Sequence, residues 1–266
     1  METTYWTPNV ATPASAVTVN IPDTIIPQGP CTQHVLVSKG NALVSDISRI
    51  RVLANGQTIW DVSMGMYVAM LQRFSANHFV LNTGNKILPL YYYLVDQKGA
   101  SARYSSQVPP GARVSIQLDF GSITPSGEGL DLLSTFTSVP ALSYPTLISS
   151  PTQVAAGSTN AVVQIKQNVL MRGFALEDPL DITRIELNAS GVMLYNGCSG
   201  TAFANEQLAH QCPDRATVDL DPVFNRVGPV SVGGDGTQLL ISTGGGYTGV
   251  ATEYCIYGAV PLGQES

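Results

Sequence analysis

Three residues whose side chains are good zinc ligands lie close together in the sequence: Cys198, His210 and Cys212. Compact zinc sites pair their ligands only two to four residues apart, and a spacing of C-x13-C does not fit that pattern. Free cysteine is also among the most buried residue types. We therefore expect reduced, buried thiols here and predict no metal site.

The segment NGCSGT (196–201) resembles a nucleophile elbow around Ser199, but its second glycine is misplaced for the G-x-S-x-G pattern. A serine that caps a helix is the better interpretation. The glycine-rich segment STGGGYTG (242–249) resembles a phosphate-binding loop, but it lacks the following lysine and helix. We therefore predict no catalytic residue, no cofactor and no enzymatic activity.

Arg49 and Arg184 stand out among the charged residues because each occupies the same place in a repeated segment. The segment DISRIRVLANGQTIWD (46–61) returns without a gap as DITRIELNASGVMLYN (181–196), 135 positions further on. Such an offset is close to half of the 266 residues, so fixed-period duplication is the first architecture to consider.

Both arginines neighbour isoleucines that are expected to face a core, so we expect the arginine side chains to point outward. One interpretation pairs them with Asp46 and Asp181 of their own copies, an interaction that contributes little if it is exposed. The other makes Arg49 and Arg184 contacts to a neighbouring subunit. We take both as candidate subunit-interface residues.

The elements after each copy are also alike. An apolar stripe at helical spacing predicts a helix after Ser63, which is placed to cap it, and a shorter helix after Ser199. Each half then reaches a strand with alternating apolar residues, RVSIQLDF (113–120) in the first and VATEYCIY (250–257) in the second. We match these two strands with each other.

Composition indicates the class of fold. The 25 glycines and 17 prolines are scattered and separate short β-branched runs, which is typical of an all-β sandwich. We predict two tandem jelly-roll β-sandwiches, each with one inserted short helix. The first jelly roll spans 1–121 and the second 160–266. A connector over 122–159 is expected to pack on the surface, with a helical turn at 130–136.

Charge argues against direct binding of nucleic acid. The net charge is −6, and the 13 lysines and arginines form no basic run that could neutralise phosphates. The first residues lack the basic start and apolar core of a signal peptide, and no apolar run is long enough to span a bilayer. We expect a protein made in the cytoplasm.

Aromatic residues leave two interpretations open. Trp60 and the cluster LYYYL (90–94) could form a sugar-binding platform, but aromatics in β-rich chains more often fill the core or a subunit interface.

The repeated pair of strand and helix resembles the double jelly-roll major capsid proteins of tailless icosahedral viruses with an internal membrane, bacteriophages among them. ISRIRVLANGQTIW with VAMLQRFSANHF, and ITRIELNASGVMLY with TAFANEQLAHQ, carry the resemblance. In size the chain is similar to the corticovirus-type proteins rather than to the larger tectivirus and adenovirus relatives. The resemblance implies a homotrimer whose six barrels form a pseudo-hexamer in the virion shell. It also implies vertex and membrane proteins of the virion, and an internal lipid membrane, as partners.

Three alternatives stay open at this stage. The chain could be a virion spike that binds host glycans, or a sandwich-fold carbohydrate enzyme, although no carboxylate pair is recognisable in the sequence. It could also be a minor capsid protein at the fivefold vertices, which usually needs only one jelly roll.

Overall fold

A computed structural model describes residues 2–6, 16–20, 31–38, 40–74, 86–91, 114–121, 130–136, 144–156, 161–164, 169–177, 182–189, 191–198, 215–219, 230–232 and 238–257. The chain divides into two compact units. Unit 1 comprises Met1–Val68 and Phe79–Thr146, and unit 2 comprises Ala69–His78 and Leu147–Ser266.

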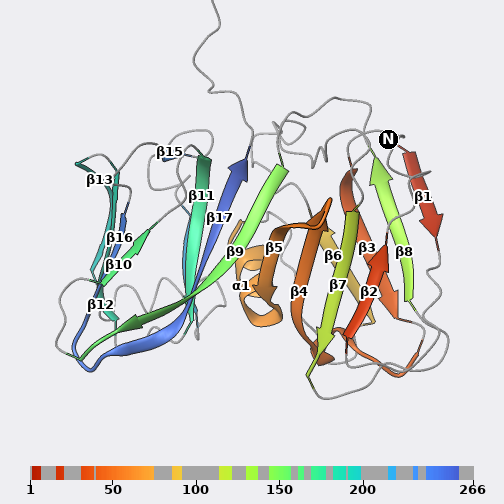
Figure 1. Ribbon diagram of the computed structural model, residues 1–266, viewed down its shortest axis with the longest axis horizontal. Coiled ribbons are helices and arrows are strands. Elements are labelled where there is room, and N and C mark those ends of the chain that lie inside the picture. Colours follow the sequence, from red (N-terminus) through yellow and green to blue (C-terminus); the bar gives the residue numbers. More distant parts are fainter. Residues whose placement is uncertain are drawn as a thin grey trace, which may run out of the picture. The chain divides into compact units, whose positions relative to one another are not determined.

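Unit 1 contains two sets of four antiparallel strands (Figure 1). The first set runs in the order β1 (Glu2–Trp6), β8 (Leu130–Phe136), β3 (Cys31–Ser38) and β6 (Ile87–Tyr91). The second runs in the order β2 (Ala16–Asn20), β7 (Val114–Phe120), β4 (Ile47–Ala54) and β5 (Gln57–Ser63). The first strand along the chain pairs with the last, as it does in a jelly roll.

Unit 2 repeats this order strand for strand. One set is β9 (Tyr144–Val154), β17 (Tyr247–Tyr257), β11 (Val169–Glu177) and β14 (Arg215–Asp219), and β15 (Val230–Val232) also pairs with β11. The other set is β10 (Ala161–Gln164), β16 (Gln238–Thr243), β12 (Ile182–Ala189) and β13 (Val192–Cys198). Within the described residues, both units therefore have the same strand order.

The expected helical turn at 130–136 is wrong. This segment is strand β8, which pairs with both β1 and β3, so the predicted connector contributes a strand to the middle of a sheet. In unit 2 the corresponding place, between β9 and β11, belongs to β17. The jelly-roll boundaries at 1–121 and 160–266 stay a prediction.

The sequence match between 113–120 and 250–257 is wrong for the same reason. Strand β7 pairs with β4 and β2, and its counterpart by pairing is β16, which pairs with β12 and β10. Strand β17 instead corresponds to β8. Both candidate strands alternate apolar and polar residues, and alternation alone does not identify the partners of a strand.

The repeated segment forms matching hairpins, β4–β5 and β12–β13. In each hairpin the first strand alternates between buried and exposed residues except at one break, Ser48–Arg49 or Thr183–Arg184, and its inward residues are less than 10% exposed. These are Ile47, Ile50 and Val52 on β4, and Ile182, Ile185 and Leu187 on β12. Arg49 and Arg51 on β4, and Arg184 and Glu186 on β12, lie at the exposed or half-buried positions between these residues, as the alternation predicted.

The irregularities of these hairpins are repeated as well. Pairing of β4 with β7 skips Ser48, and pairing of β12 with β16 skips Thr183. Pairing of β5 with β4 skips Ile59, and pairing of β13 with β12 skips Leu194. Each member of a pair lies 135 positions from the other, so two β-bulges occur at the same places in both units.

The tight turn of the first hairpin explains a repeated glycine. Asn55 and Gly56 have φ values of 51° and 79°, which a two-residue type I′ turn requires at both positions. Gly191, the counterpart of Gly56, also has a φ of 79°. Glycine adopts this conformation without strain from a Cβ atom.

The aspartate that begins the first repeat shapes the chain before β4. Its Oδ2 accepts a hydrogen bond from the Leu43 backbone N–H at 2.7 Å, which closes the 3₁₀ turn η2 (Val44–Asp46). The hydroxyl of Ser48 then donates to the backbone carbonyl of Asp119 at 3.1 Å, beside the bulge. Asp46 is therefore a turn residue.

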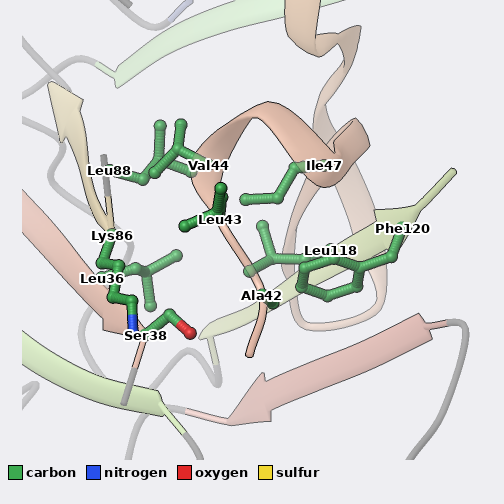
Figure 2. Close-up of a pocket in the computed structure, with 10 residues that line it drawn as sticks. All are labelled: Leu36, Ser38, Ala42, Leu43, Val44, Ile47, Lys86, Leu88, Leu118 and Phe120. Atoms are coloured by element: carbon green, nitrogen blue, oxygen red, sulfur yellow. The ribbon is translucent and has the colours of Figure 1, made fainter. Parts of the chain in front are cut away.

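A small cavity of about 10 Å³ lies under this turn, between the two sheets of unit 1 (Figure 2). Apolar side chains dominate its lining, which consists of Leu36, Ser38, Ala42, Leu43, Val44, Ile47, Lys86, Leu88, Leu118 and Phe120. A space of this size is at the lower limit for a single water molecule.

Helix α1 (Met64–Phe74) begins directly after β5. The Ser63 hydroxyl accepts a hydrogen bond from the Met66 backbone N–H at 3.3 Å, so the predicted N-cap is confirmed. Tyr67 donates from its hydroxyl to the Pro89 carbonyl at 2.8 Å, and its ring lies 5.6 Å from that of Trp60. The second predicted helix, after Ser199, lies outside the described residues. No helix in the described part of the chain has the length and apolar character needed to cross a membrane.

We predict that Gly249→Ala destabilises the protein by about 1–3 kcal/mol, because an added Cβ overpacks a filled site. That Cβ would lie 2.5 Å from the hydroxyl oxygen of Tyr247, whose buried ring is held by a 2.5 Å hydrogen bond to the Glu177 carbonyl. Gly244→Ala is the matched control, since a Cβ there meets no atom within 4 Å. Urea unfolding should show a change below about 0.5 kcal/mol for the control. Equal unfolding midpoints for the two variants would contradict this account.

Candidate functional site

Arg49 and Arg184 occupy equivalent positions on β4 and β12. Arg49 lies opposite Asp119 of β7, and Arg184 lies opposite Ser242 of β16. Both side chains are 46% exposed, so the predicted outward orientation is confirmed. The two arginines belong to different units.

Arg49 makes a two-point ion pair within unit 1. Its Nε donates to Asp61 Oδ1 at 2.5 Å, and its Nη2 donates to Asp61 Oδ2 at 2.7 Å. The hydrogen bond to Asp61 raises the pKa of the Arg49 guanidinium. The partner is Asp61 on the adjacent strand, rather than the predicted Asp46.

Arg51, two residues along the same face, is bound by three side chains. Its Nη1 donates to Gln117 Oε1 at 2.9 Å, and its Nη2 forms an ion pair with Asp119. Its Nε also lies 3.8 Å from Asp61 Oδ1. Asp61 and Asp119 thus lie on the two strands that flank the arginines, and the four charges alternate across β5, β4 and β7.

Unit 2 balances the same position in another way. Arg184 forms an ion pair with Glu186, two residues away on its own strand. Asp181, the other partner expected from the sequence, lies outside the described residues. The sign at the counterpart of Arg51 is therefore reversed, and this ion pair runs along one strand.

This reversal is accompanied by the loss of both aspartates. Strand register places Asn196 opposite Glu186, where unit 1 has Asp61 opposite Arg51. It likewise places Ser242 opposite Arg184, where unit 1 has Asp119. Among the described residues, the cluster of unit 1 contains two cations (Arg49 and Arg51) and two anions (Asp61 and Asp119), and that of unit 2 contains one of each (Arg184 and Glu186). Within the described part of the chain, cations and anions are therefore equal in number in both clusters.

Sequence reasoning missed Asp61 and Asp119 as partners. A signal was present in the aligned segments, because Arg51 faces Glu186 and Asp61 faces Asn196 in that alignment. These paired differences together keep the charge balanced. Asp119 lay outside the aligned segments, and only the pairing of β4 with β7 places it in the cluster.

The cluster offers charged groups and hydrogen-bond donors rather than a nucleophile held by a base. Among the described residues, no group of three histidine, cysteine, aspartate or glutamate side chains could hold a metal ion. Of the potential zinc ligands noted above, His210 and Cys212 lie outside the described residues, as does the side chain of Cys198.

Trp60 is a core residue and contributes nothing to a sugar-binding surface. Its side chain is 1% exposed and packs beside Tyr67. In the cluster LYYYL, Leu90 is buried, whereas the tyrosine side chains lie outside the described part of the chain. The core interpretation is thus confirmed for Trp60.

Comparison with solved structures identifies the fold. The chain is similar to the major capsid protein P2 from Bacteriophage PM2, with a TM-score of 0.70 and 12% identity, over 98% of this chain and 99% of that one. A chain in the structure of Sulfolobus Turreted Icosahedral Virus gives a TM-score of 0.62 and 14% identity, over 96% and 90%. The Faustovirus major capsid protein gives 0.57 and 8%, over 96% and 89%.

Comparison of sequences finds no such similarity. No protein-family model matches the chain, and no curated protein matches it. The similarity to the solved structures is therefore one of fold, and the chain has the double jelly-roll fold of these capsid proteins.

We predict that Arg51→Glu destabilises unit 1 by about 1–2 kcal/mol, because it removes charge-assisted hydrogen bonds and adds a third carboxylate to a partly exposed cluster. Adding Asp61→Asn and Asp119→Ser gives unit 1 the side chains of unit 2 and should restore most of the lost stability. Urea unfolding measures both effects, and the loss in the single variant should shrink at high salt. A triple variant no more stable than the single one would show that charge balance is not what links these positions.

Proposed function

We propose that this chain is a structural major capsid protein whose homotrimers form pseudo-hexamers and tile an icosahedral shell over an internal membrane. The observation that carries the proposal is the shared fold over nearly the whole of both chains, with 98% of this chain and 99% of the PM2 capsid protein covered. The proposed role is structural and involves no catalysis.

The duplication supports a trimer with near-sixfold edges. Each chain supplies two units with the same strand order, so three chains supply six similar units. Closed threefold symmetry then presents comparable edges in six directions. Weaker lateral contacts between trimers complete the shell.

Charge supports the same role for a different reason. The chain carries 19 acidic and 13 basic residues, which is unfavourable for contact with a nucleic-acid genome. A shell that rests on a lipid membrane needs no such contact. In this proposal the partners are other copies of the chain, the vertex and membrane proteins of the virion, and the membrane beneath. The protein is made in the host cytoplasm and resides in the virion.

The two matched arginines support a lateral role for the outward face of β4 and β12. Each side chain is about half exposed, on the outer face of a strand whose inward side chains are buried in the core. Arg49 and Arg184 are therefore proposed to lie in contacts between subunits.

We predict that the purified native protein has three times the 28.2 kDa mass of the chain. Size exclusion coupled to light scattering measures that mass, and electron microscopy of concentrated samples should then show shells or sheets of trimers. A protein that stays monomeric at high concentration would overturn the proposal and make glycan binding the next activity to assay. A pentamer would instead indicate a vertex protein.

A further inference from the structure

Arg49 and Arg51, both on the outer face of β4, differ in how many of their N–H donors are already bound. An arginine side chain has five N–H donors in a planar fork. Asp61 takes one edge of the Arg49 fork, formed by Nε and Nη2. Among the described residues Nη1 of Arg49 has no hydrogen-bond acceptor, and the side chain is 46% exposed.

Arg51 differs in that each of its three nitrogens faces a group of its own unit. Nη1 is bound by Gln117, Nη2 by Asp119, and Nε lies near Asp61. Its side chain is also less exposed, at 31%. Arg49 and Arg51 lie on the same strand and the same face, so they differ mainly in how many of their guanidinium nitrogens are bound within unit 1.

An arginine held on one edge is well suited to bind with the other. Association is less favourable when it immobilises long side chains, because their conformational entropy is lost. A side chain that is already fixed before binding avoids part of that cost. Arginine is also enriched at the energetic centres of interfaces because its fork matches a carboxylate.

Resting on the proposed capsid function, we infer that the free edge of Arg49 binds a carboxylate on a neighbouring copy of this chain. A second copy is the occupant because the proposed shell is built from copies of this chain, and its 19 acidic residues supply carboxylates. Asp61 acts as the positioning residue that aims the guanidinium outward.

The test compares Arg49→Lys with Arg51→Lys in the full-length protein. Lysine keeps the charge at either position and removes the fork. For Arg49→Lys we expect association between copies to weaken by about tenfold or more, with little change in the unfolding temperature. For Arg51→Lys we expect the reverse, a lower unfolding temperature with association close to that of the natural protein.

Sedimentation over a dilution series measures association, and thermal unfolding of the dilute protein measures stability. Association of the natural protein should also weaken as salt is raised. A natural protein that assembles together with an Arg49→Lys variant that assembles equally well would overturn this inference and leave the capsid proposal standing. Loss of association in proportion to loss of stability in both variants would also overturn it, because it would indicate a purely structural role. A natural protein that does not associate at all would overturn the capsid proposal itself.

Discussion

The alternation of buried and exposed side chains along β4 and β12 is the constraint on which both units depend. Ile50 and Ile185 are almost completely buried, and the arginines next to them are about half exposed. A shift by one residue would exchange these two sets of side chains and place charges in the core. The neighbouring strands, the turn at Asn55–Gly56 and the N-cap of α1 are all consistent with this one register.

Divergence between the two units has preserved local neutrality instead of individual residues. Unit 1 spreads its charges over three strands, whereas unit 2 keeps a cation and an anion on β12. An uncompensated charge on a partly covered sheet face would be unfavourable in either arrangement. Two copies of one fold have therefore reached the same balance with different side chains, which leaves each face free to meet a different environment.

Local patterns in the sequence predicted the duplication, the all-β fold, the outward arginines and the N-cap at Ser63. They failed where a structural feature depends on partners distant in the chain. Residues 130–136 carry no clear alternation, and they become a strand because β1 and β3 pair with them on either side. The cluster around Arg51 was missed for a related reason, since Asp119 lies 68 positions away and reaches it only through the register of β4 and β7.

The paired bulges at Ser48 and Thr183, and at Ile59 and Leu194, have a consequence for how this chain can evolve. Between the two bulges lies a short window, 49–52 in one unit and 184–187 in the other, in which the central strand is in phase with both neighbours. Inside that window even a reversal of charge has been accepted. The number of residues has not changed, because one deletion would put one edge of the strand out of step with the other. These strands therefore tolerate substitutions within the window but not insertions or deletions.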